Sequence, residues 1–209
     1  MTLPKLQYIS HGQTYEEQEY SILSALDAGI QWIQLRWKKA NESDILKLAE
    51  KIKLRTDAYN AILIINDYPH IAKKINATGV HLGLKDIPVL EARNILHNHQ
   101  WIGGTANTYD DVLQRIKENV TYIGLGPLKF TTTKENLSPI LGIEGYKRII
   151  QKLNKIQIPI YAIGGITLDD IEALIAAGVY GIAISSAFNT AKDKSNFVKQ
   201  INQKLYATT

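Results

Sequence analysis

The chain has 209 residues with 45% hydrophobic content, enough for one large domain, and its lack of cysteine excludes disulfides and thiolate metal sites. No apolar run approaches the ~20 residues that cross a bilayer, and the N-terminus lacks a secretory-signal pattern, so we expect a cytoplasmic protein without membrane partners. The net charge of +4 arises from lysines dispersed through helix-like segments, which favours small anionic substrates over nucleic acid.

Strand-like runs and helix-spaced segments alternate from one end of the chain to the other. Several of the runs are almost entirely apolar, as expected of parallel strands that are buried on both faces. The eight strands expected from these runs are Leu6–Ile9, Trp32–Arg36, Ala61–Asn66, Gly79–Leu82, Trp101–Thr105, Val120–Leu125, Ile160–Ile163 and Gly181–Ser185.

The segments between these runs carry the spacing of amphipathic helices. Between residues 45 and 52, apolar side chains recur at the three- and four-residue steps of one helix face. Thr108 and Thr167 each precede an Asp by three positions, a pattern typical of a capped helix start. The weakest expected helix is the short third one, between Pro69 and Asn76.

This unbroken alternation, with no linker rich in Pro, Gly or Ser, favours a single α/β domain over residues 1–209. Eight β–α units predict a closed (β/α)8 barrel, or TIM barrel, at the small end of its size range. A doubly wound open sheet is the alternative. Its G-x-G-x-x-G fingerprint is absent after the first strand, where residues 8–12 contain one glycine.

In such a barrel, side chains at the carboxyl ends of the strands converge on one rim. The second strand ends in Gln-Leu-Arg-Trp-Lys, and strand alternation directs Gln34, Arg36 and Lys38 to the same face. Arg and Lys pointing together into a barrel mouth suit an anionic ligand, Arg by its bidentate fork and Lys as a point charge. The alternative interpretation is a surface edge of salt bridges.

Two carboxylates follow neighbouring strands. Asp67 ends the third strand and Asp86 follows the fourth, so the pair could share a divalent ion. Mg²⁺ in particular is held by one or two carboxylates together with substrate phosphates. Each Asp could instead cap the helix that follows it. His81 lies inside the fourth strand, where a hydrogen-bonded core histidine is the commoner finding.

Three loops offer groups that bind phosphate. Pro127 ends the sixth strand, and the loop at residues 126–134 carries three threonines and a lysine before helix spacing returns near Tyr146. Long loops inside compact domains tend to be functional, although a solvated Thr-rich loop is the alternative. Gly164-Gly165 after the seventh strand and Ser185-Ser186 after the eighth stand at the usual phosphate site of a barrel.

Together these segments resemble the thiamine-phosphate synthase family. The resemblance runs in order from Leu6 to Ser186 and implies a (β/α)8 barrel that joins a hydroxymethylpyrimidine diphosphate to a thiazole phosphate and releases diphosphate. The motifs that carry it are Gln34-Leu-Arg-Trp-Lys38, Ile65-Asn-Asp67, Gly79-Val-His-Leu-Gly83 with Asp86, Gly126-Pro followed by Thr131-Thr-Thr-Lys134, and Ala162-Ile-Gly-Gly-Ile166.

The resemblance also implies the role of each site residue. Those implied to hold the diphosphate are Arg36, Lys38, Asn66 and Lys134, and those implied to hold Mg²⁺ are Asp67 and Asp86. Gln34 and His81 would contact the aminopyrimidine, and Thr105 would lie near the reacting centre. Those implied to hold the thiazole phosphate are Thr131, Thr133, Gly165, Ser185 and Ser186. Arg36, Lys38, Thr105 and Lys134 form the expected catalytic set.

These roles agree with the chemistry of the reaction. The thiazole nitrogen already has a lone pair, so its attack needs no general base. The difficult step is breaking a carbon–oxygen bond to diphosphate, while the amino group of the pyrimidine stabilises the resulting cation. Catalysis then consists of positioning and of stabilising charge on the leaving group, which cations, amides and Mg²⁺ supply.

Two alternative functions remain open from the sequence. A related barrel acts as a thiazole tautomerase through a histidine after the fifth strand, but the matching residue here is Asn107, which has no useful proton-transfer pKa. A non-catalytic barrel that binds a phosphorylated metabolite would need no metal pair. Leu84, Lys85 and Tyr68 depart from the family pattern beside the two aspartates, with an effect that the sequence leaves open. Homo-oligomer formation and a carboxylated thiazole are also left open.

Overall fold

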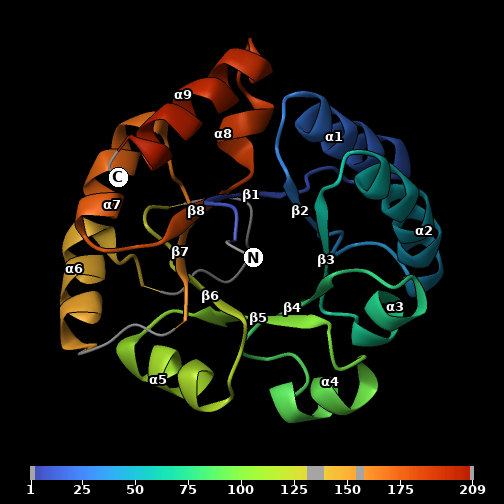
Figure 1. Cartoon of the computed structure of the whole chain (residues 1–209), viewed down its shortest axis with the longest axis horizontal. Coiled ribbons are helices and arrows are strands. Elements are labelled where there is room, and N and C mark those ends of the chain that lie inside the picture. Colours follow the sequence, from blue (N-terminus) through green and yellow to red (C-terminus); the bar gives the residue numbers. More distant parts are fainter. Residues whose placement is uncertain (1–2, 131–138, 154–157, 208–209) are drawn as a thin grey trace.

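The computed structural model describes residues 3–130, 139–153 and 158–207, and its centre is a closed barrel of eight parallel strands. Each strand pairs with its neighbours in the chain, and β8 closes the ring against β1 (Figure 1). The strands are β1 (Leu6–Ile9), β2 (Trp32–Leu35), β3 (Ile62–Asn66), β4 (Gly79–Leu82), β5 (Trp101–Ala106), β6 (Tyr122–Leu125), β7 (Ile160–Ile163) and β8 (Gly181–Ile184).

Helices surround this ring on the outside, as the view along the barrel shows (Figure 1). The predicted TIM barrel is therefore confirmed, and the open-sheet alternative is wrong. The helices are α1 (Tyr15–Asp27), α2 (Glu42–Ala58), α3 (Pro69–Lys74), α4 (Val89–Ile95), α5 (Tyr109–Lys117), α6 (Gly142–Lys152), α7 (Ile171–Ala176), α8 (Ser186–Asn189) and α9 (Lys194–Tyr206), with a 3₁₀ turn over Leu168–Asp170.

The local signals in the sequence explain where several helices begin. Thr108 and Thr167 each accept a hydrogen bond from the backbone three residues on, while the Asp there bonds back to the cap, so both expected capping boxes form. The short third helix forms with Pro69 at its first position. The helix expected near Tyr146 starts earlier, at Gly142, whose φ of +58° suits glycine.

The interior of the barrel is filled unevenly. Trp32, Tyr122 and Tyr161 stand at the amino ends of their strands, are fully buried, and pack edge to face with ring centroids 4.8–5.8 Å apart. This aromatic plug closes one end of the barrel because large rings fill it. The carboxyl ends of the strands hold smaller and polar side chains, which leaves room there for a pocket. In the part of the chain that the structure describes, no helix is long and apolar enough to span a membrane.

Candidate active site

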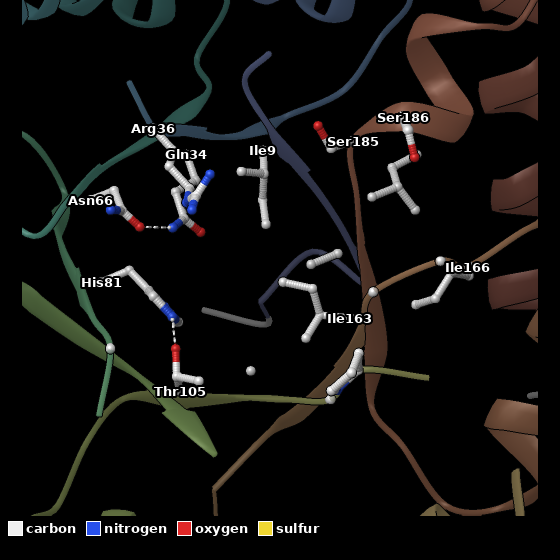
Figure 2. Close-up of a pocket in the computed structure, with 18 of the residues that line it drawn as sticks. Ile9, Gln34, Arg36, Asn66, His81, Thr105, Ile163, Ile166, Ser185 and Ser186 are labelled. Atoms are coloured by element: carbon white, nitrogen blue, oxygen red, sulfur yellow. Dashed lines mark hydrogen bonds between the residues drawn. The ribbon is translucent and has the colours of Figure 1, made fainter. Parts of the chain in front are cut away.

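A pocket opens at the carboxyl ends of the strands. In Figure 2 its labelled side chains surround one cavity from several sides of the barrel. Among the expected site residues, those that line it are Gln34, Arg36, Lys38, Asn66, Asp67, His81, Asp86, Thr105, Gly165, Ser185 and Ser186. Thr131, Thr133 and Lys134 lie outside the described residues. The barrel thus brings together residues as far apart in the chain as Gln34 and Ser186, as expected of side chains at one rim.

An amide pair lies on one side of the pocket. Gln34 on β2 and Asn66 on β3 are both buried, and the Gln34 Nε2 donates to the Asn66 Oδ1 at 2.8 Å (Figure 2). This bond fixes the orientation of both side chains because each occupies one end of it. The Gln34 oxygen and the Asn66 nitrogen remain for contacts on either side. Arg36 continues the same face of β2 into the pocket.

His81 is held from below by a chain of hydrogen bonds inside the barrel. Its Nδ1 lies 3.1 Å from the Tyr122 hydroxyl, which accepts from the Gln7 Nε2 at 3.3 Å. Its Nε2 lies 3.0 Å from the Thr105 hydroxyl at the pocket (Figure 2). Burial raises the pKa of Tyr122, so the phenol keeps its proton. With Gln7 donating to the phenol oxygen, that proton is available to Nδ1. His81 is therefore both a hydrogen-bonded core histidine and a pocket residue.

The two predicted metal-binding carboxylates lie together. Asp67 stands directly after β3 with a φ of +68°, a conformation that is unusual for a residue with a side chain. Its N–H donates to the His81 carbonyl at 2.9 Å, which holds this conformation. The Asp86 carboxylate accepts from the Gly83 N–H at 2.6 Å. Neither Asp makes a side-chain cap for α3 or α4, so the capping interpretation is wrong for both.

The protonation of the two carboxylates is linked. Burial and a hydrogen bond with Asp86 raise the pKa of Asp67 from 3.8 to about 6, against the opposing effect of Lys38, which forms an ion pair with Asp67. Burial alone would raise the pKa of Asp86, but hydrogen bonds from Asp67 and the Gly83 N–H bring it below its ordinary value. Like charges held this close share protons, and a cation relieves their repulsion.

The two carboxylates suit a hard cation that takes only a few of its ligands from the protein. Among the described residues, no group of three or more His, Cys, Asp or Glu side chains converges on one point. A structural zinc or calcium site would need more protein ligands than that. Two carboxylates beside a pocket for phosphates match the way in which Mg²⁺ is held, because Mg²⁺ retains waters and takes substrate oxygens. The Lys38 ammonium forms an ion pair with Asp67, so a positive charge already lies beside this carboxylate.

The opposite side of the pocket has the features of an anion cradle. Gly164 and Gly165 follow β7 with φ values of +91° and +70°. A Cβ on Gly165 would lie 2.8 Å from the Lys129 Cβ, so only glycine fits. Within the described part of the chain, the buried Ser185 Oγ has no hydrogen-bond partner, and Ser186 begins α8 beside it. A buried hydroxyl without a partner, in a residue that lines the pocket, is a group that still calls for one.

Sequence reasoning missed the apolar part of the pocket. Ile9, Ile163 and Ile166 line it (Figure 2), and Ala183 lines it as well. These residues stand at or just beyond strand ends, as the polar ones do, so the alternation of each strand was the signal that could have found them. They give the pocket an apolar part beside its polar side chains. Of the residues that depart from the family pattern, Tyr68 packs on the core and Leu84 is 41% exposed.

Comparison with known proteins agrees with this geometry. A family model described as thiamine monophosphate synthase matches residues 6–188. The thiamine-phosphate synthase of Flavobacterium johnsoniae is 53% identical over 205 residues, which cover 97% of each chain. That of Phocaeicola vulgatus is 46% identical over 94% of this chain and 96% of its own. The structure of thiamine phosphate pyrophosphorylase from Pyrococcus furiosus matches with a TM-score of 0.84 at 27% identity, covering 97% of this chain and 96% of that one. The chain therefore belongs to the thiamine-phosphate synthase family.

Proposed function

We propose that this chain, as one catalytic domain over residues 1–209, is a transferase that makes thiamine phosphate. It condenses 4-amino-2-methyl-5-hydroxymethylpyrimidine diphosphate with a thiazole phosphate and releases diphosphate. One observation carries the proposal: a single pocket has cations and paired carboxylates on one side and a glycine–serine anion cradle on the other. Two anionic substrates that must meet head to head need two such sites across a dry gap. The related synthases support the same activity.

Asp67 and Asp86 would hold Mg²⁺, which supplies positive charge to the diphosphate as that group departs. Arg36, Lys38 and Asn66 would bind the remaining diphosphate oxygens from β2 and β3. Charge stabilisation in a transition state is effective only when the donors are already in place, and the bond from Gln34 holds Asn66 in position. Lys134, outside the described residues, would complete this set.

The aminopyrimidine would lie against Gln34, His81 and Thr105. The bond from Gln34 to Asn66 and the chain from Tyr122 through His81 to Thr105 hold these groups in fixed orientations. The ring would therefore be oriented with its reactive carbon facing the thiazole. Ile9 and Ile163 would exclude water from the gap, which protects the pyrimidine cation from hydrolysis.

The thiazole phosphate would bind across the gap. Gly165 and the Ser185–Ser186 turn offer N–H and hydroxyl groups there, and Thr131 and Thr133 would add hydroxyls. With the phosphate bound on this side of the pocket, the thiazole nitrogen would be held near the pyrimidine, and the reaction would take place between positioned groups. No side chain in this arrangement has to remove a proton.

The test is diphosphate release on mixing the two substrates with Mg²⁺, measured on the same preparation as thiazole tautomerisation. We expect clear condensation and negligible tautomerisation. Asn107, at the position of the tautomerase histidine, donates its side-chain N–H to the Gly126 carbonyl and ties the loops after β5 and β6 together. An amide so engaged cannot exchange protons with a thiazole. Efficient tautomerisation without diphosphate release would overturn the proposal.

A further inference from the structure

Arg115 connects the site to a helix outside the barrel. It lies in the last turn of α5 and is only 4% exposed, which is rare for a charged residue. Its Nη2 donates to the Gly83 carbonyl and its Nε to the Thr105 carbonyl, each at 3.0 Å. Its Nη1 pairs with the Glu118 carboxylate at 2.7 Å, which balances the buried charge. One planar group thus joins the carboxyl ends of β4 and β5.

The bond to Gly83 supports the turn that carries Asp86. The Gly83 carbonyl also accepts from the Asp86 N–H at 3.4 Å, and the Gly83 N–H donates to the Asp86 carboxylate at 2.6 Å. A Cβ on Gly83 would lie 2.8 Å from the same carboxylate oxygen, so the close approach depends on glycine. Arg115 therefore fixes the carbonyl around which the proposed metal ligand is folded.

The bond to Thr105 acts on the reacting centre. Arg115 holds the Thr105 carbonyl from outside the barrel, while the Thr105 hydroxyl meets the His81 Nε2 inside it. The residue is thus held at two points that face opposite sides of β5. Its hydroxyl, which lines the pocket, cannot shift unless one of these bonds is broken.

A glycine makes room for this contact. A Cβ on Gly104 would lie 2.7 Å from the Arg115 Cδ, so any larger residue there would push the guanidinium away. On the inner face, a Cβ on Gly103 would lie 2.1 Å from the Tyr122 Cζ. Gly104 therefore lets Arg115 approach from outside, and Gly103 lets Tyr122 approach from inside, in the two positions directly before Thr105.

We propose that Arg115 is a positioning residue for the reaction. It preorganises the Asp86 carboxylate and the Thr105 hydroxyl through their backbone, without touching substrate. This inference rests on the proposed function for its kinetic consequence, but its effect on cation binding is separate. Outer partners of metal ligands typically contribute about 10–100-fold to metal affinity or activity. A guanidinium can bridge two carbonyls and a carboxylate at once, whereas an ammonium on a flexible stem lacks this fixed geometry.

The experiment compares Arg115→Lys with Arg93→Lys. Arg93 on α4 also donates to two backbone carbonyls, those of Gln100 and Asn119, but at the opposite end of β5 and β6. Loss of general stability should therefore be shared by both variants. Three quantities are measured: diphosphate release, the Mg²⁺ concentration at half-maximal rate, and binding of Mn²⁺ with inorganic diphosphate, followed by electron paramagnetic resonance.

We expect Arg115→Lys to weaken Mn²⁺ binding and raise the half-saturating Mg²⁺ concentration by about 10-fold or more, with a fall in kcat, while Arg93→Lys changes each less than twofold. Gly104→Ala keeps the charge of Arg115 but displaces its guanidinium, so it should change each of the three quantities in the direction expected for Arg115→Lys. If Arg115→Lys does not fold, Gly104→Ala provides the test. Unchanged Mn²⁺ binding in folded Arg115→Lys, or an equal change in Arg93→Lys, would overturn the inference. A wild-type protein that released no diphosphate would refute the proposed function, while the Mn²⁺ comparison would still decide the role of Arg115.

Discussion

Replacing Asp67 by Asn should stabilise the protein at neutral pH while it abolishes most of the activity. The carboxyl side chain is 16% exposed, and its pKa is raised from 3.8 to about 6, chiefly by burial and by Asp86. The folded state thus favours the protonated form. Its contribution to stability is full below about pH 3.8 and is lost as the pH rises through about 6. At 1.4 kcal/mol per pH unit, ionisation costs about 2–3 kcal/mol at pH 7.5.

Asn resembles the protonated acid and cannot ionise, so the variant does not bear this cost. We expect Asp67→Asn to exceed the wild type in free energy of unfolding by about 2 kcal/mol at pH 7.5, once solvent screening is allowed for, and to match it near pH 4. The assay is urea unfolding across this pH range in a chelator. Turnover at limiting Mg²⁺ is measured in parallel and should fall, because one proposed ligand is gone.

Asp86→Asn is the matched control, since the pKa of Asp86 is shifted in the opposite direction. Its ionised form contributes stability above the ordinary carboxyl pKa, and this contribution is lost as the pH falls through the lowered value. Asp86→Asn should therefore lower stability at pH 7.5 and also lower turnover. If Asp67→Asn were no more stable than the wild type at pH 7.5, the electrostatic reasoning would be refuted. Normal activity of both variants at limiting Mg²⁺ would refute the metal assignment.

Three further substitutions test other parts of the site. Gly165→Ala forces a side chain into a left-handed conformation and against Lys129, at a cost of about 1–2 kcal/mol. Steady-state kinetics should show a larger rise in the KM for thiazole phosphate than in the KM for the pyrimidine diphosphate. Tyr122→Phe leaves His81 and Gln7 without the phenol hydroxyl, so urea unfolding should show a loss of about 1–3 kcal/mol in the free energy of unfolding. NMR of the His81 ring nitrogens should show a changed tautomer balance, and an unchanged spectrum would exclude the hydrogen-bond chain. Lys134→Ala should lower kcat by roughly 10²–10³, whereas a change confined to the KM for thiazole phosphate would place Lys134 at the other phosphate.

Much of the fold and of the site could be predicted from local sequence. The alternation of strand and helix signals determined the barrel, because eight β–α units close most simply into one ring. Once the barrel was inferred, Arg36, Asp67 and Asp86 became site candidates from position, since all carboxyl strand ends face the same rim, while the role of Thr105 came from the family resemblance. The capping box at Thr108 was likewise readable, because its partners lie within one helical turn.

The tertiary structure decided which of these residues contact one another. That Lys38 pairs with Asp67, 29 positions away, depends on the register of β2 against β3. The raised pKa of Asp67 depends on burial by neighbours from several strands, which no local pattern encodes. Arg115 carried only the signal of a basic residue in the last turn of a helix. Its bond to Gly83, 32 positions away, arises because α5 packs on β5 where Gly104 leaves room. Local sequence determines periodicity and caps, whereas such contacts arise only when distant segments pack together.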